Sequence, residues 1–171
     1  GERVIAEHGK GRVIGIRDGA ERVICDDLRA PVELATDGVS LFVTDRGRGR
    51  VFEIARDGEP VPKRRVIKKL KAPEGLAVYR GGLLVVEGES GRIVHVADGE
   101  STLVALVAPG TPPAAPTQPP SMVLNDVAVL GDVLYATGET NRVLYRIDLA
   151  TRAAAADAGE PQTTNKPKNE E

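Results

Sequence analysis

The chain has 171 residues and a net charge of −2, with 23 basic and 25 acidic residues spread along its length. It shows no basic face of the kind that binds nucleic acid. The single cysteine, Cys25, excludes an intrachain disulfide and a cysteine metal cluster. No apolar run reaches the roughly 18 residues of a membrane-spanning helix, and the 19 glycines and 12 prolines are typical of a turn-rich β protein.

Residues 1–27 predict the last three strands of a four-stranded unit, separated by short polar turns such as Asp18-Gly19. The predicted strands are Arg3–Ala6, Arg12–Ile16 and Arg22–Cys25. The first strand of this unit would lie before Gly1, so we expect the chain to be a fragment. Because the sequence begins without a methionine, the absence of a signal peptide leaves the cellular compartment undecided.

Residues 28–69 and 70–107 each predict a complete four-stranded unit. The strands of the first unit are Val32–Thr36, Leu41–Thr44, Val51–Ala55 and Val66–Lys69. The strands of the second unit are Glu74–Val78, Leu83–Val86, Ile93–Val96 and Thr102–Leu106. The basic run Lys63–Lys71 falls on an outer strand, where its charges discourage edge-to-edge pairing. A patch for an acidic partner is the alternative interpretation of this run.

The proline-rich residues 108–121 cannot form a strand, because proline lacks the amide that a ladder needs. We expect a polyproline-like loop, either a stiff lid over Asn125 or a spacer. Residues 122–150 predict three strands of a further unit: Val123–Val129, Val133–Ala136 and Val143–Ile147. Residues 151–171 are polar and proline-containing, which predicts a disordered tail.

A two-strand motif recurs in all four units. The copies are Arg3–Ile16, Leu41–Ile54, Leu83–Val96 and Val133–Arg146. A period of about 40 residues, built from short strands and glycine-rich turns, is the signature of β-propeller blades. We therefore expect an all-β fold, a β-propeller segment of about four four-stranded antiparallel blades of which the first and last are incomplete.

An arginine follows the turn in every copy of the motif. The arginines are Arg12, Arg50, Arg92 and Arg142, each preceded by a residue that tolerates left-handed backbone: Gly11, Gly49, Gly91 or Asn141. The strand before the turn ends near Glu7, Asp45, Glu87 or Thr137. We predict that each arginine makes a structural hydrogen bond or ion pair to that residue across the hairpin.

The segments PEGLAV with LLVVEGESGRIVHV, and LNDVAV with VLYATGETNRVLYRI, resemble NHL-repeat propellers and the related senescence-marker-protein/gluconolactonase propellers. The resemblance covers roughly residues 3–148. Its blade pattern is specific to this superfamily and not to one function. It implies part of a six-bladed ring in which the starts of the inner strands face a central channel.

Gluconolactonase-like members of this superfamily hold a divalent metal, often calcium, in the channel. By resemblance, Glu74 matches the glutamate ligand position and Asn125 the asparagine position, and Asp126 is the candidate general base. Val32 occupies the ligand position of the second unit, and Glu33, one residue later, is a candidate binding residue. The alternative is that these polar residues only hydrogen-bond loop backbone. Calcium takes about 6–8 oxygens, so we expect these residues alone to bind it weakly.

Two functions are therefore expected. The first is an NHL-like scaffold that recognises a protein or a small molecule at the channel face. The alternative is a divalent-metal-dependent lactonase or esterase-type hydrolase, in which the ion would polarise a carbonyl and lower the pKa of a bound water. The open end faces of an incomplete ring also predict that the isolated chain self-associates.

Overall fold

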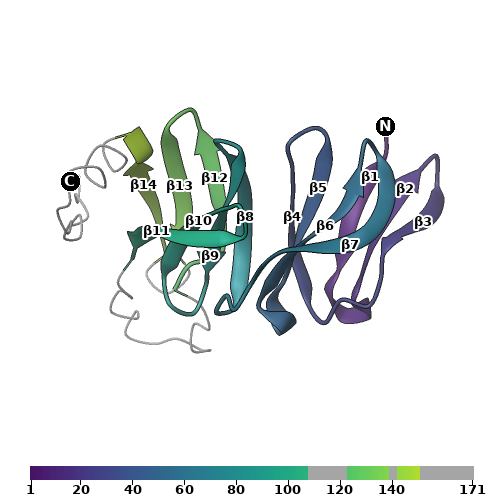
Figure 1. The fold of residues 1–171 in the computed structure, drawn as a ribbon, viewed down its shortest axis with the longest axis horizontal. Coiled ribbons are helices and arrows are strands. Elements are labelled where there is room, and N and C mark those ends of the chain that lie inside the picture. The colour runs from purple at the N-terminus through teal and green to yellow at the C-terminus, as the bar shows by residue number, and fades with distance from the viewer. Residues whose placement is uncertain (108–122, 139–141, 151–171) are drawn as a thin grey trace.

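The computed structural model describes residues 1–107, 123–138 and 142–150, which form four antiparallel sheets (Figure 1). The first sheet contains β1 (Arg3–Glu7), β2 (Arg12–Arg17) and β3 (Ala20–Cys25). The second contains β4 (Pro31–Thr36), β5 (Ser40–Asp45), β6 (Arg50–Arg56) and β7 (Glu59–Lys68). The third contains β8 (Pro73–Tyr79), β9 (Gly82–Glu87), β10 (Arg92–Ala97) and β11 (Glu100–Leu106). The fourth contains β12 (Val127–Leu130), β13 (Val133–Gly138) and β14 (Val143–Asp148).

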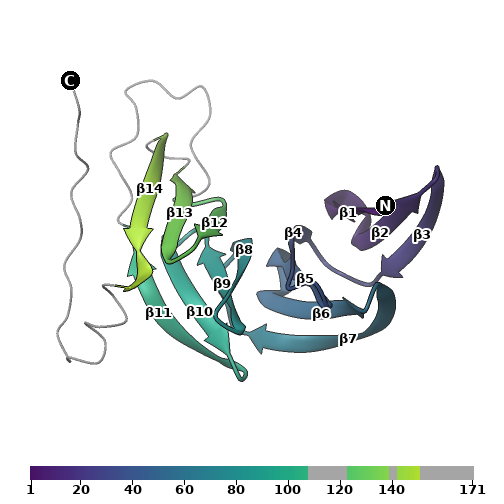
Figure 2. The ribbon, with the colours of Figure 1, turned by 90° about the horizontal axis from the view of Figure 1, so that it is seen from above.

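The sheets follow one another along an arc, and each is a meander of strands in chain order. Strand β4 packs beside β1 and β8, and β8 packs beside β12, so the innermost strands of successive sheets are neighbours. Seen from above, the innermost strands lie on the concave side of the arc and the outer strands β7 and β11 on the convex side (Figure 2). This arrangement confirms the predicted β-propeller segment, with two four-stranded sheets between two three-stranded ones.

The hydrophobic core is divided among the spaces between sheets. One cluster, which includes Val13, Val43 and Ile54, lies between the first and second sheets. A second, which includes Val51 and Val85, lies between the second and third sheets, and a third fills the space between the third and fourth. Alternate residues of a strand point to opposite faces, so each middle sheet contributes to two of these clusters.

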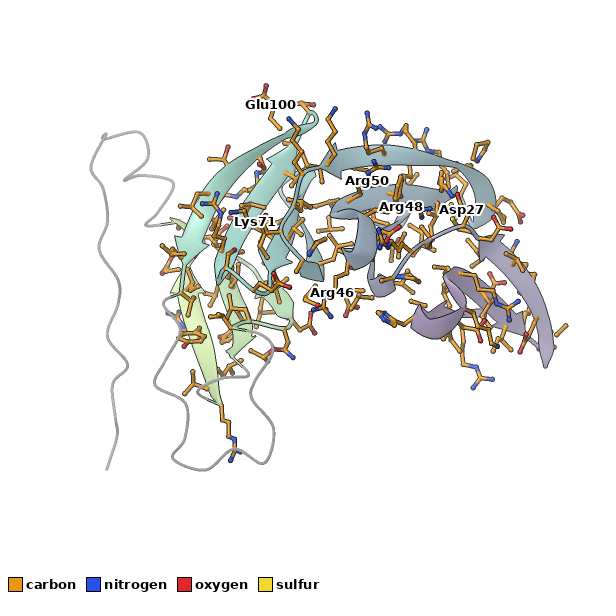
Figure 3. The ribbon with its side chains drawn as sticks, turned by 90° about the horizontal axis from the view of Figure 1, so that it is seen from below. Asp27, Arg46, Arg48, Arg50, Lys71 and Glu100 are labelled. Carbon is orange, nitrogen blue, oxygen red and sulfur yellow. The ribbon has the colours of Figure 1, made fainter. Side chains whose placement is uncertain are left out.

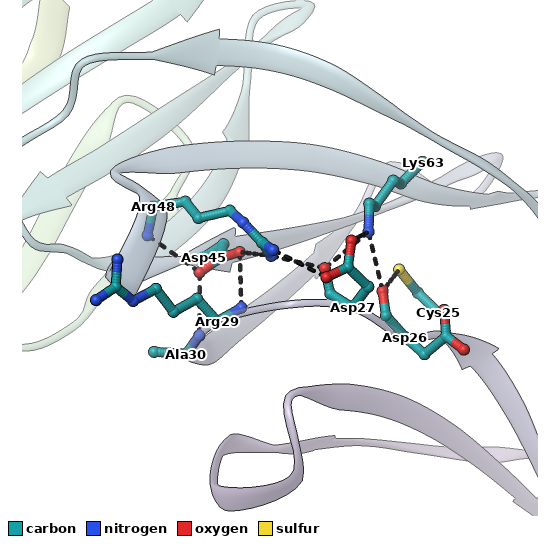
Figure 4. Close-up of polar contacts among 8 residues, drawn as sticks. All are labelled: Cys25, Asp26, Asp27, Arg29, Ala30, Asp45, Arg48 and Lys63. Carbon is teal, nitrogen blue, oxygen red and sulfur yellow. Dashed lines mark hydrogen bonds and ion pairs between the residues drawn. The ribbon is translucent and has the colours of Figure 1, made fainter.

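The carboxylate at the end of β5 ties the connection between the first and second sheets. Asp45 is fully buried and accepts hydrogen bonds from the backbone amides of Arg29 and Ala30, each at 3.0 Å (Figure 4). It also forms an ion pair with Arg48, whose Nη1 lies 3.1 Å away. These contacts hold the chain that leads into β4, the inner strand of the second sheet.

The predicted ion pairs across the hairpins are confirmed in the first and third sheets. The Arg12 guanidinium pairs with Glu7, and Arg92 Nε donates to Glu87 at 2.9 Å. Glu87 also accepts a hydrogen bond from the Lys71 amide at 2.6 Å. It therefore holds the connection between the second and third sheets, as Asp45 holds the connection between the first and second. In the second sheet the prediction is wrong in its partner, because Asp45 pairs with Arg48 from the turn.

The fourth copy of the repeat is shifted by one residue from the predicted alignment. Arg142 has φ +55°, the left-handed conformation that Gly11, Gly49 and Gly91 adopt in the other copies. Pairing of Gly138 with Val143 and of Thr137 with Leu144 places Val143 where the other copies have arginine. The turn spans four residues in every copy. The shift arises because Gly138, and not Thr137, occupies the position that Glu7, Asp45 and Glu87 hold in the other copies.

Three further predictions have different outcomes. Strand β12 begins at Val127, later than predicted, because the amides of Val123 and Leu124 bond to the Gly88 carbonyl instead of a neighbouring strand. The proline-rich segment 108–121 and the tail 151–171 lie outside the described residues. Within the part of the chain that the structure describes, no helix has the length and apolarity to cross a membrane.

Candidate functional site

The innermost strands of three sheets begin with polar residues at matching positions. Leu34 pairs with Val43, Leu76 with Val85 and Val127 with Ala136, which aligns the three strands residue by residue. One matched position holds Val32, Glu74 and Asn125. The next holds Glu33, Gly75 and Asp126. We call Glu33, Arg46, Glu74, Asn125 and Asp126 together the polar edge.

Glu33 and Asp126 have the same local hydrogen bonds although they belong to different sheets. The Glu33 amide donates to the Thr44 hydroxyl at 2.9 Å, and the Asp126 amide donates to the Thr137 hydroxyl at 3.1 Å. Each carboxylate also accepts the amide of the following residue, at 3.1 Å for Glu33 and 2.7 Å for Asp126. The two carboxylates are therefore held in equivalent orientations on their own strands.

Gly75 lies between these two residues in the order of the sheets. A Cβ atom at this position would come within 2.7 Å of the Asp126 Cα and 2.8 Å of the Val127 amide nitrogen. The absence of a side chain at residue 75 thus lets the third and fourth sheets approach closely. The Thr44 hydroxyl lies 3.1 Å from the Glu74 carbonyl oxygen, which joins the second sheet to the third at the same level.

Glu33 is half-buried, and its carboxyl has a raised pKa. Burial, which penalises the charged form, is the main cause of the raised pKa, and the negative charge of Asp126 adds to it. The carboxylates of the second and fourth sheets are therefore close enough to influence each other. Glu33 and Asp126 were singled out from the sequence separately, and the structure brings them into one electrostatic environment.

Glu74 is buried and forms an ion pair that the sequence did not predict. Arg46 Nε lies 2.8 Å from Glu74 Oε1, and the same guanidinium lies 3.9 Å from Glu89. Arg46 begins η2 (Arg46–Arg48), the short 3-10 helix after β5, and lies on the concave side of the arc between the second and third sheets (Figure 3). Its position immediately after the strand-terminal Asp45 is the only sequence signal that could have identified it.

Thr44 and Thr137 were also missed as supports of the polar edge. The structure matches Thr137 to Thr44, both one residue before the end of the second strand of their sheets. The pattern of the sequence alone instead matches Thr137 to the acidic residues Asp45 and Glu87. Aligning the two threonines in the sequence would have revealed their common role.

The polar edge does not fit a metal ion as it is arranged. The Arg46 guanidinium occupies the contact that Glu74 would offer to a cation. Asn125 is exposed, and its described hydrogen bond runs from its backbone amide to the Thr137 carbonyl at 3.0 Å. Among residues 1–107, 123–138 and 142–150, no three His, Cys, Asp or Glu side chains gather in a group that could hold a metal. Calcium requires about 6–8 oxygens, which this arrangement does not provide.

Replacement of Gly75 by alanine tests the close approach of the third and fourth sheets. The added methyl group meets backbone atoms of the fourth sheet, so we expect Gly75→Ala to lower the free energy of unfolding by about 1–3 kcal/mol, measured by urea denaturation. Gly9→Ala is the matched control, because nothing lies within 4 Å of a Cβ atom at Gly9. Equal stability of the two variants would contradict the packing described here.

The raised pKa of Glu33 predicts a pH-dependent gain in stability for Glu33→Gln. A carboxyl whose pKa is higher in the folded state favours folding while it is protonated, and this contribution is lost as the pH rises through that pKa. We expect the variant to be slightly more stable than the wild type at neutral pH, with the difference vanishing below the ordinary pKa of glutamate. Urea denaturation across this pH range measures the difference in the free energy of unfolding between the variant and the wild type. The exposed Glu100→Gln should show no such trend, and a variant less stable than wild type at pH 7 would refute the assignment.

No protein-family model and no curated protein matches this chain. Several solved structures, however, are similar to it in fold. A luciferin-regenerating enzyme has a TM-score of 0.59 at 19% identity, over 79% of this chain and 50% of its own. Virginiamycin B lyase from Staphylococcus aureus has a TM-score of 0.58 at 18% identity, over 87% and 52%. The calcium-binding protein regucalcin from Agrobacterium tumefaciens has a TM-score of 0.57 at 15% identity, over 74% and 43%.

This chain spans about half the length of each of these solved structures. At such low identity the likeness concerns the fold alone. Together with the four successive sheets and their neighbouring inner strands, it shows that the chain has a β-propeller fold.

Proposed function

We propose that this chain is an NHL-like binding scaffold that recognises a small molecule or a protein at the channel face, where the innermost strands begin. We further propose that a cationic group of the ligand binds between Glu33 and Asp126. The observation that carries this proposal is the matched placement of two carboxylates from different sheets, each oriented by the amide of the residue that follows it. Burial is the main cause of the raised pKa of Glu33, and the negative charge of Asp126 adds to it.

A positive charge between the two carboxylates would relieve their mutual repulsion and take up oxygen lone pairs that the backbone leaves available. Each carboxylate is oriented by a single amide of its own strand, at 3.1 Å for Glu33 and 2.7 Å for Asp126. The site therefore needs little rearrangement to bind a cation, and pre-organisation of this kind favours affinity. Arg46 and Glu74 neutralise each other beside it, which limits the net charge of the polar edge.

The test is isothermal titration calorimetry with spermidine and agmatine as cationic probes and citrate as an anionic one. We expect saturable binding of a cationic probe and none of citrate. In the double variant Glu33→Gln, Asp126→Asn the affinity should fall at least about tenfold, because a hydrogen bond to a charged group contributes about 1.5–3 kcal/mol. Glu100→Gln removes one negative charge from the β10–β11 turn and should leave the affinity unchanged. Binding that survives the double variant, or no binding of either cation, would refute the proposal.

The alternative function is a metal-dependent lactonase or esterase in which Glu74 and Asn125 bind the ion and Asp126 acts as general base. Regucalcin is a calcium-binding protein, and this chain is similar to it in fold alone. In this chain the Arg46–Glu74 ion pair opposes such a site, because the guanidinium would have to leave before a cation could approach the carboxylate. We therefore favour the scaffold over the hydrolase.

Calcium titration distinguishes the two functions. We expect the wild-type chain to bind Ca²⁺ no more tightly than a Kd of about 10⁻⁴ M, the weak end of the range for protein sites. Arg46→Ala should increase the affinity, because it removes the guanidinium that pairs with the Glu74 carboxylate, whereas Arg65→Ala, on the outer strand β7, should not. Stoichiometric micromolar binding of Ca²⁺ by the wild-type chain would contradict this expectation and support the hydrolase.

A further inference from the structure

Each sheet of the arc has a forward face, toward the sheet that follows it, and a backward face, toward the sheet that precedes it. The internal repeat allows the same position to be compared on successive forward faces. The registers of β1–β2, β5–β6, β9–β10 and β13–β14 place Val13, Val51, Ile93 and Leu144 at one such position. Val13, Val51 and Ile93 are 0% exposed, whereas Leu144 is 64% exposed.

Two more residues of the fourth sheet repeat this pattern. Leu130 of β12 matches Tyr79 of β8, which packs against the core between the third and fourth sheets, yet Leu130 is 74% exposed. Tyr135 of β13, which is half-buried, matches Leu84, which is fully buried in that core. The forward face of the fourth sheet thus carries apolar residues where the other sheets carry residues covered by a neighbour.

The backward face of the first sheet is the counterpart. Ile5 of β1 matches Val43 of β5 and Val85 of β9, both 0% exposed, yet Ile5 is 42% exposed. Ile14 of β2 lies directly across from Ile5 on the same face and is 3% exposed, so Ile5 is the partly exposed residue of this pair.

The covered interfaces show which forward and backward residues meet. Val13 and Val43 belong to one core cluster, Val51 and Val85 to the next, and Ile93 and Ala136 to the third. In each cluster the first residue lies on a forward face, at the position equivalent to Leu144. The second lies on a backward face, at the position equivalent to Ile5. Leu144 and Ile5 would therefore meet if the fourth sheet were followed by a first sheet.

We propose that the forward face of the fourth sheet binds the backward face of the first sheet of a second copy of this chain, and that two such contacts close a two-copy ring. Within one copy these faces lie at opposite ends of the arc (Figure 2). Two copies would supply eight sheets, within the usual 4–8 blades of a propeller. Head-to-tail contacts close into rings when the rotation allows.

The first test is the mass of the full chain by sedimentation equilibrium. We expect twice the 18.1 kDa of one copy. Leu144→Glu and Ile5→Glu should each shift the mass to that of one copy, with an unchanged far-ultraviolet circular dichroism spectrum. Leu106→Glu is the control, because Leu106 is exposed on the outer strand β11, away from both faces, and should leave the dimer intact. A wild-type monomer, as expected if chain outside the described residues covers these faces, would refute the proposal. A dimer that resists both variants would also refute it.

The second test defines which faces meet and does not depend on charged substitutions. Leu144→Cys and Ile5→Cys are made separately in a Cys25→Ala background, which leaves one cysteine in each variant. Mild oxidation of the mixed variants should give a disulfide-linked pair that neither variant gives alone. A Leu144→Cys homodimer would instead indicate face-to-face pairing of the fourth sheets and would overturn the head-to-tail arrangement, as would the absence of any crosslink.

Discussion

The structure depends on the burial of sheet faces against neighbouring sheets, which covers both faces of the two middle sheets. A fully buried valine or leucine contributes about 1.5–3 kcal/mol, and Val43, Val51, Val85 and Ile93 are each fully buried between two sheets. No sheet has a core of its own, because the core lies in the spaces between sheets. A sheet at the end of the arc therefore keeps one apolar face partly exposed, which is the basis of the proposed pairing of copies.

Buried carboxylates connect this packing to the functional site. Asp45 and Glu87 end the second strands of their sheets and hold the amides of the connections that lead into the inner strands of those same sheets. These contacts fix where β4 and β8 begin, and hence where Glu33 and Glu74 lie. The polar edge is thus a consequence of how each sheet is joined to the next, because its residues come from positions that the connections determine.

The two acidic residues that resemble ligand positions have different environments. Glu74 has a guanidinium partner, so its charge is compensated inside the protein. The pKa of the Glu33 carboxyl is raised, mainly by burial and additionally by the negative charge of Asp126. This contrast, and not the presence of carboxylates alone, favours a cation-binding scaffold over a metal-dependent hydrolase.

The sequence by itself determined the strands, the four sheets and the order of the blades, because alternating apolar residues and glycine-rich turns are local signals repeated four times. It also identified the arginine–glutamate pairs of the first and third hairpins, which join residues close in the chain. Only the tertiary structure revealed the Arg46–Glu74 pair and the proximity of Glu33 to Asp126, because these contacts cross between sheets. It also corrected the register of Arg142, since the pairing of Gly138 with Val143 places Gly138 where the other copies have an acidic residue. Contacts between sheets depend on how the sheets pack, and a pattern read along one strand carries no information about the strand that faces it.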